Sequence, residues 1–170
     1  MLVNIIKRAR HIEANAPTPS LNIFLHTKFT EDGIKKNLAD FCKLDDNDIL
    51  TAIKIWTDHP DNILSFLCKG IVNRSLLKVK YFGSGIDNEL LERKRNSVMK
   101  TFEISEKESS YLVFTGQTEN KTYSNKDEHI HILFKDETIK DISEVDNALI
   151  NQTLFGTAKK FYICFPESEL

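Results

Sequence analysis

The chain has 170 residues, which is enough for one domain or two small ones around a hydrophobic core. Its net charge of −2 gives no sequence-wide basic field, so nucleic-acid binding is not expected. No apolar run is long enough to span a membrane, and basic residues interrupt the apolar stretch that a signal peptide would need.

The three cysteines indicate the redox environment. Cys42, Cys68 and Cys164 are scattered, form no C-x-x-C pair, and each lies in an apolar run. This pattern predicts reduced, buried thiols in a cytoplasmic protein, with neither disulfides nor a structural metal site.

The first predicted element is an amphipathic helix from Leu2 to Ala14. Its apolar stripe has helical spacing and consists of Leu2, Ile5, Ile6, Ala9 and Ile12. The opposite face is basic and consists of Lys7, Arg8, Arg10 and His11. We expect this basic face to be solvated or docked on another domain.

Two further helices are predicted after a proline-containing breaker at residues 15–20. Ser20 is expected to cap a short helix that buries Leu21, Phe24 and Leu25. Thr30 is expected to cap the next one, whose inner face consists of Ile34, Leu38 and Phe41.

Residues 44–70 contain the clearest helix start. Asp45 or Asp46 can accept hydrogen bonds from the free N–H groups of the first turn, and Asp48 suits the positive end of the helix dipole. Three carboxylates also suit acid–base chemistry, but helix capping accounts for them more simply. The helix buries Ile49, Ala52, Ile53 and Trp56 and ends at His59-Pro60. A second helix follows with Ile63, Leu64, Leu67 and Cys68 inside, and Gly70 is expected to be its C-cap.

The second half alternates strands and helices. We predict a strand from Leu77, a Gly83-Ser84-Gly85 boundary, a helix at 87–102, strands at 111–115 and 129–134, a helix at 142–154 and a strand at 160–165. The fold class is therefore predicted as α+β: an N-terminal helical bundle (residues 1–75) followed by a ferredoxin-like βαββαβ antiparallel sheet (residues 76–170).

Several kinds of site are disfavoured by spacing. His129 and His131 could chelate a metal from one face of a strand, but no third ligand is evident. The predicted sheet lacks the aromatic run of an RNA-recognition module. Gly83-Ser84-Gly85 has neither the dinucleotide-binding spacing nor the P-loop lysine, and no Ser or Cys lies in a nucleophile turn. We therefore expect no catalytic residue and no metal.

Arg74 and Lys78 form the most suggestive basic pair, at the turn from helix to strand. Arginine offers a planar fork of donors and lysine a point charge, and together they suit a phosphate chain. The alternative is an ordinary pair of solvated surface charges.

The region around this pair resembles a known family. Three pieces are similar to the region after the catalytic core in HD-domain phosphohydrolases of the deoxynucleoside triphosphate triphosphohydrolase branch. They are Leu44-Asp45-Asp46, the helix before the turn, and Arg74-Ser75-Leu76-Leu77-Lys78. The runs IIKRAR, SSYLVFTG, HILFKDETIKDISE and FYICFP also look like bacterial members. In regulated members the Arg and Lys of the R-x-L-[FYL]-K element contact nucleotide phosphates between subunits, and Arg74 and Lys78 match them. Leu77 stands where many members have an aromatic residue, so the resemblance does not extend to base stacking at that position.

The catalytic signature of that family is missing. The chain contains no His-Asp dipeptide, so a divalent metal would belong to an HD core outside it. The resemblance implies the C-terminal part of such an enzyme, as a fragment or a separate gene product, predicted to be inactive alone. Its expected role is assembly and regulation, with nucleotide-effector binding through Arg74 and Lys78. Its expected partners are an HD catalytic domain, a nucleotide effector and further copies of itself. The alternatives are a purely structural module without a ligand and an independent enzyme with an unrecognised site.

Overall fold

A computed structural model describes residues 1–120, 130–141 and 158–167 of the chain. Two compact units can be distinguished: Met1–Lys80 with Asp87–Phe114 and Ile163–Leu170, and Tyr81–Ile86 with Thr115–Tyr162. We refer to them as the first and the second unit. The predicted domains, residues 1–75 and 76–170, are a different division, and that division stays a prediction.

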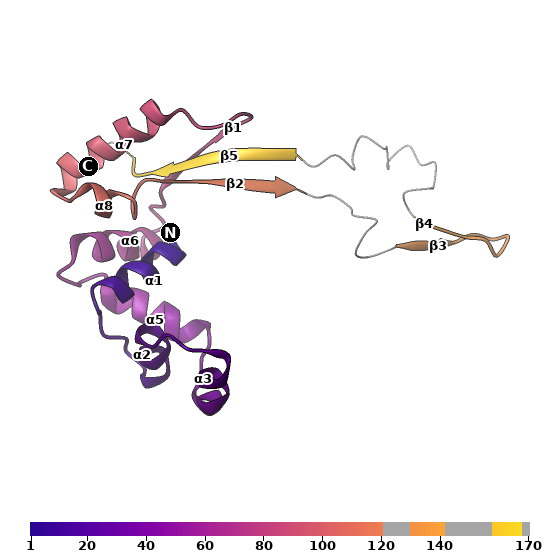
Figure 1. The fold of residues 1–170 in the computed structure, drawn as a ribbon, viewed down its shortest axis with the longest axis horizontal. Coiled ribbons are helices and arrows are strands. Elements are labelled where there is room, and N and C mark those ends of the chain that lie inside the picture. Colours follow the sequence, from indigo (N-terminus) through magenta and orange to yellow (C-terminus); the bar gives the residue numbers. More distant parts are fainter. Residues whose placement is uncertain (121–129, 142–157, 168–170) are drawn as a thin grey trace. The chain divides into compact units, whose positions relative to one another are not determined.

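The described residues form eight helices and five strands (Figure 1). The helices are α1 Leu2–His11, α2 Pro19–His26, α3 Glu31–Lys36, α4 Leu38–Phe41, α5 Asp46–Trp56, α6 Asn62–Val72, α7 Asn88–Phe102 and α8 Glu106–Ser109. The strands are β1 Lys78–Phe82, β2 Phe114–Asn120, β3 His131–Leu133, β4 Ile139–Asp141 and β5 Ala158–Phe165. In this part of the chain, no helix is long and apolar enough to cross a membrane. The mixed α+β class is confirmed.

The first unit has its core where α1 and α5 pack against α6. The fully buried side chains of these three helices include Ile5, Ile53, Trp56, Ile63, Leu64 and Leu67. The indole N–H of Trp56 donates to the carbonyl of Asn15 at 2.9 Å, so the single tryptophan is buried with its polar atom satisfied. The predicted stripes of α5 and α6 face the core, and in α1 Ile5 and Ala9 do, whereas Leu2 at its start is 49% exposed.

Helix starts follow local side-chain chemistry. Asp45 and Asp48 form a reciprocal capping box on α5, which confirms that these carboxylates cap the helix. Thr30 caps α3 as predicted. Thr18, rather than Ser20, caps α2, because Pro19 occupies the first helical position and moves the start forward.

The predicted inner face of the Thr30 helix is wrong. The segment breaks into α3 and α4 at Asn37, and Ile34, Leu38 and Phe41 are each at least 39% exposed. Neither short helix contributes a buried residue, so the N-terminal bundle is not confirmed.

Gly70 is not the C-cap of α6. It lies inside that helix and is buried. A Cβ atom at this position would lie only 2.9 Å from the carbonyl oxygen of Ser75, so the close packing favours glycine. The helix continues to Val72, and Asn73 takes the C-cap position.

The five described strands form two separate sheets. One has the order β1-β5-β2, and the arrows of β2 and β5 point in opposite directions in Figure 1. The other is an antiparallel hairpin of β3 and β4, with Leu133 opposite Ile139.

The ferredoxin-like order is not confirmed, since that arrangement needs the 129–134 strand in the main sheet. The physical reason is local: Asp136 accepts from the N–H and hydroxyl of Thr138, and Glu137 adopts a left-handed conformation. The strand β4 that follows this tight turn was not predicted. A short-range partner costs little loop entropy, so β3 pairs with β4. The helix predicted at 142–154 lies outside the described residues.

Candidate functional site

The turn from α6 to β1 positions the predicted phosphate pair. Helix α6 ends at Val72, Asn73 is its C-cap, and Arg74 follows in the left-handed region with φ of 58°. The N–H of Arg74 donates to the carbonyl of Ile71 at 3.3 Å, which closes the turn. Glycine or asparagine is the usual residue at this position, because a side chain is strained there. Arg74 shares this uncommon conformation with Glu13 and Glu103 of the first unit, and of the three it is the one that carries a positive charge.

Arg74 and Lys78 differ in their surroundings. Arg74 is exposed, and among the described residues its side chain makes no hydrogen bond or ion pair. Lys78, the first residue of β1, pairs with the carboxylate of Glu167, which follows β5. The structure thus places both predicted residues at the helix-to-strand turn, and their role in binding stays a prediction.

Glu167 also borders a small hollow in the first unit. The hollow has a volume of about 70 Å³ and is lined by Lys94, Ser97, Val98, Thr101, Phe102, Phe165, Pro166 and Glu167. The ammonium of Lys94 lies 4.1 Å from the centre of the Phe165 ring. This volume suits a few water molecules and is too small to enclose a nucleotide. A phosphate ligand would have to bind on the open surface of the turn.

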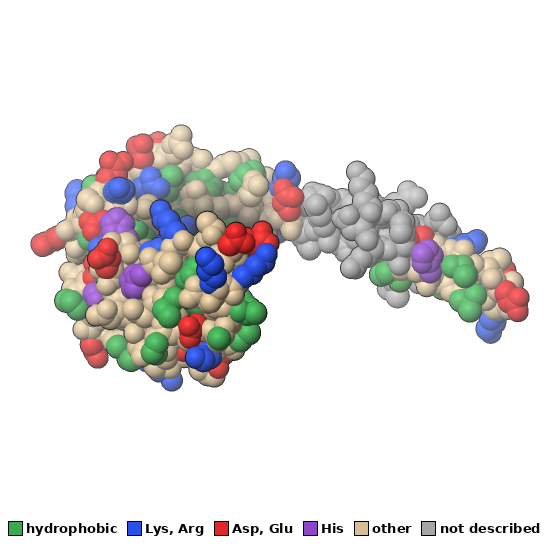
Figure 2. All heavy atoms as spheres, turned by 60° about the horizontal axis from the view of Figure 1, so that its bottom comes forward, with side chains coloured by type: hydrophobic (Ala, Val, Ile, Leu, Met, Phe, Trp, Pro, Cys, Tyr) green, Lys and Arg blue, Asp and Glu red, His purple; other side chains and the backbone are tan. Residues whose placement is uncertain are grey.

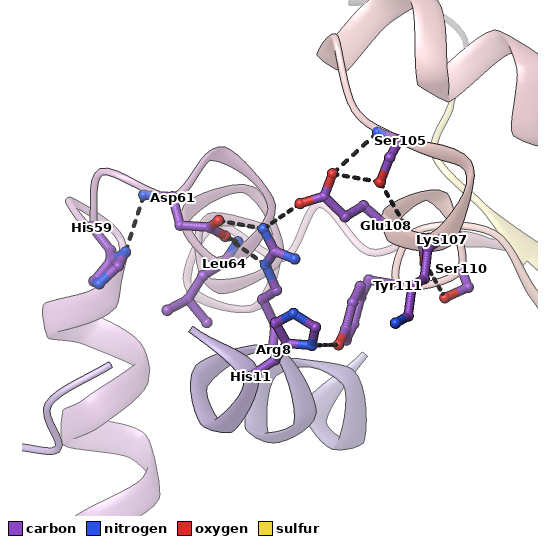
Figure 3. Close-up of polar contacts among 10 residues, drawn as sticks. All are labelled: Arg8, His11, His59, Asp61, Leu64, Ser105, Lys107, Glu108, Ser110 and Tyr111. Carbon is purple, nitrogen blue, oxygen red and sulfur yellow. Dashed lines mark hydrogen bonds and ion pairs between the residues drawn. The ribbon is translucent and has the colours of Figure 1, made fainter. Parts of the chain in front are cut away.

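A second polar cluster lies deeper in the first unit and is drawn in Figure 3. Its centre is Arg8 of α1, whose side chain is only 6% exposed. The guanidinium donates to both oxygens of Asp61, at 3.0 and 2.6 Å, and to Glu108 at 2.8 Å. Asp61 is the N-cap of α6 and also accepts from the N–H of Leu64 at 2.8 Å. Arg8 therefore ties α1 to the start of α6 and to α8.

These contacts shift three pKa values. Hydrogen bonding to Asp61 raises the pKa of Arg8 and outweighs burial. Burial would raise the pKa of Asp61, but the hydrogen bonds from Arg8 and Leu64 together lower it. Hydrogen bonds from Ser105 and Arg8 lower the pKa of Glu108. All three groups are charged near neutral pH, which suits a structural ion cluster rather than a proton-transfer site.

The predicted solvated basic face is wrong for Arg8, whereas Arg10 is exposed and also hydrogen-bonded within the unit. Arg8 is buried, and its guanidinium lies 5.3 Å from the centre of the Tyr111 ring. Arg10 donates to the carbonyls of Leu25 at 2.7 Å and Phe24 at 3.3 Å, which satisfies the C-terminal end of α2. The hydroxyl of Tyr111 is 3.3 Å from Nδ1 of His11. Arg8, Arg10 and His11 therefore contact other elements of the same unit.

Helix α1 connects this cluster with the turn. At its N-terminal end, the sulfur of Met1 accepts from the N–H of Leu77 at 3.2 Å. The terminal methyl of Met1 also packs where a side chain on Gly70 would lie. Leu77 lies between Arg74 and Lys78 in sequence, so the contact from Met1 supports the backbone of the candidate site. Arg8 holds the same α1 region in place through its ion pairs.

Sequence reasoning missed Asp61 and Glu108, although both carry a local signal. Ser105-Glu106-Lys107-Glu108 is a capping-box sequence, and Ser105 and Glu108 form that box on α8. Asp61 precedes the apolar run of α6 in the position of an N-cap. These signals could have predicted the caps, but not the salt bridges to Arg8.

The remaining candidates give no site. His129 lies outside the described residues, and His131 is exposed on β3. Within the described residues, no group of three His, Cys, Asp or Glu side chains could hold a metal. All three cysteines are free, but Cys42 is exposed, so the prediction that it is buried is wrong. Burial raises the pKa of the Cys68 thiol to about 12 and makes it a poor nucleophile.

The charges visible on one face of the molecule are mixed. Figure 2 shows Lys and Arg side chains interspersed with Asp and Glu, without a continuous basic area on that face. The surface that the figure shows offers no extended track for a nucleic-acid backbone.

Comparison with solved structures gives a similar protein over most of the chain. The crystal structure of a phosphohydrolase from Bacteroides thetaiotaomicron VPI-5482 matches with a TM-score of 0.85 and 32% identity, covering 98% of this chain. The chain spans 43% of the length of that protein. No protein-family profile matches the sequence, and no curated protein matches it either. The chain is thus related in structure to part of a phosphohydrolase.

Proposed function

We propose that this chain is the regulatory and assembly module of an HD-type, dNTP-triphosphohydrolase-like enzyme, and that it binds a nucleoside triphosphate effector through Arg74 and Lys78. A catalytic domain, in the same chain or a separate one, would supply the metal and the chemistry. Further copies of the module would complete the effector site. The similarity to part of a phosphohydrolase supports this assignment.

The observation that carries the proposal is the state of Arg74. Its backbone is in a left-handed conformation, which costs an L-residue roughly 1–2 kcal/mol. Its side chain is exposed, and it has no ion-pair or hydrogen-bond partner among the described residues. A residue with a strained backbone and no stabilising side-chain contact suggests that the side chain binds a ligand. A guanidinium four residues from an ammonium offers a phosphate chain both a fork of donors and a point charge.

A thermal-shift titration with GTP and the four dNTPs, with and without Mg²⁺, tests the proposal. A nucleotide at about a hundred times its Kd should stabilise the chain by roughly 2.7 kcal/mol. Arg74→Glu should abolish this shift. Lys54→Glu is the matched control, because Lys54 is an exposed lysine of α5 away from the turn. A nucleotide shift that survives in Arg74→Glu would refute the proposal.

The rival function is a structural module without a ligand. The Arg8 cluster favours it, since Arg8, Asp61 and Glu108 join three helices into one unit. On that account no nucleotide shifts the unfolding midpoint, and Arg74 and Lys78 are dispensable. Because the effector site is proposed to lie between copies, the titration should be repeated at high protein concentration.

A further inference from the structure

The ion pair of Lys78 suggests how the proposed effector site is controlled. Glu167 lies directly after Pro166 at the end of β5, and its carboxylate pairs with the ammonium of Lys78. Both partners belong to the first unit. The two side chains are 51% and 59% exposed, so solvent and solutes can reach the pair.

The pair is a weak contact that a phosphate can replace. An exposed ion pair contributes little to stability, because water screens the charges and two long side chains lose rotamer freedom. A triphosphate carries several negative charges and offers the ammonium a stronger partner than one carboxylate. Before it binds, however, the Glu167 carboxylate occupies the lysine and repels an approaching anion.

We propose that Glu167 is an internal competitor for the phosphate site, so that a nucleoside triphosphate must displace the Glu167 carboxylate from Lys78 before both cations can bind it. Glu167 thereby acts as an autoinhibitory contact that sets the effector concentration needed for binding. Arg74, without a partner among the described residues, would capture the phosphate chain first, and Lys78 would follow when Glu167 leaves. This inference rests on the function proposed above.

Binding of GTP and of inorganic tripolyphosphate, measured by calorimetry, tests the competition. Glu167→Gln should tighten the Kd of both ligands about two- to fivefold, the range that corresponds to removing one exposed ion pair. The gain should shrink at 0.5 M salt, where the Debye length is only a few ångströms. In a Lys78→Gln background, Glu167→Gln should bring no gain, because the two residues then no longer interact.

Glu92→Gln is the matched control. Glu92 is an exposed carboxylate of α7 in the same unit, and its loss changes the net charge equally. An equal gain in Glu92→Gln would overturn the inference, because the effect would then come from the overall charge. A wild-type chain that binds nucleotide with the same Kd as Glu167→Gln would overturn it while leaving the proposed function standing. If neither the wild type nor Glu167→Gln binds either ligand, the proposed function fails, and the competition fails with it.

Discussion

At the scale of single residues, the backbone strain at Arg74 lowers the stability of the fold, and its side chain presents an exposed positive charge. The left-handed position after α6 suits glycine, yet the chain places there a long cation with no partner among the described residues. Loss of the side chain should therefore affect ligand binding and stability in opposite directions.

Arg74→Gly should stabilise the chain by about 0.5–1 kcal/mol, because relief of the strain exceeds the added entropy of the unfolded state. The same substitution should abolish nucleotide binding. Urea unfolding and calorimetry measure the two effects. Arg74→Gln is the control, since it removes the charge but keeps the strain, and it should lose binding without gaining stability. Destabilisation of Arg74→Gly by 1 kcal/mol or more would mean that the arginine supports the fold.

Arg8 has the opposite role, because its charge is used inside the fold. Arg8→Met should destabilise the chain by about 2–4 kcal/mol at pH 7, since Asp61 would remain partly buried without its partner. Lys7→Met, which removes an exposed charge from the same helix, should change stability by less than about 0.5 kcal/mol. Urea unfolding provides the comparison.

The pKa directions add a pH dependence to this test. Asp61 and Glu108 have folded-state pKa values below their ordinary range, so their stabilisation is present above about pH 4 and is lost as the pH falls through the folded values. The stability difference between wild type and Arg8→Met should therefore narrow from pH 7 to pH 3. A difference that stays constant over this range would show that Arg8 acts through packing alone.

At the scale of elements, α1 and α6 together shape the turn. Gly70 lies where the last part of α6 meets Met1 and the backbone of Ser75. Helix propensity favours alanine over glycine by about 1 kcal/mol, whereas the close approach to Ser75 opposes any side chain. The backbone contact should dominate, because a carbonyl oxygen cannot rotate away as a flexible side chain can.

Gly70→Ala should therefore destabilise the chain by about 1–3 kcal/mol, despite the better helix propensity. Lys69→Ala is the control at the neighbouring, exposed position of α6, where little change is expected. Thermal unfolding of both variants measures the difference. Equal stability of Gly70→Ala and wild type would show that α6 and the Ser75 segment separate easily, and that the turn is less rigid than the contact implies.

At the scale of the whole molecule, the question is whether the first unit carries a ligand or only supports another domain. Leu67 is fully buried in the core where α1, α5 and α6 meet, and it does not belong to the turn. Its substitution should lower stability without changing the site itself, so it separates the two functions.

Leu67→Ala should lose about 2–5 kcal/mol of stability, because it leaves a cavity in the core. At a temperature well below its unfolding midpoint, its Kd for nucleotide should equal that of the wild type, whereas Arg74→Glu should show the reverse pattern. Chemical denaturation and calorimetry at 10 °C make the comparison. A loss of affinity in Leu67→Ala while the chain is still folded would place the ligand contact in the core rather than at the turn.

Local chemistry determined much of this structure from the sequence by itself. The capping box of α5, the cap of α3, the helix at 87–102 and the strand that begins near Leu77 each depend on neighbours within a few residues, and each was predicted. The position of Arg74 and Lys78 at a helix-to-strand turn followed for the same reason.

Only the tertiary structure decided how these elements are joined. Arg8 looked like a solvated charge because its partners, Asp61 and Glu108, lie 53 and 100 residues away in the chain. Lys78 likewise finds Glu167 only because β1 and β5 share a sheet. The order β1-β5-β2 was also not predictable from the sequence, because strand pairing depends on which segments compete for each sheet edge. β3 pairs with β4 because the tight turn between them brings β4 close in sequence and in space. Hydrophobic periodicity reports which side of an element is buried, but it does not identify the distant charge or strand that the element will contact.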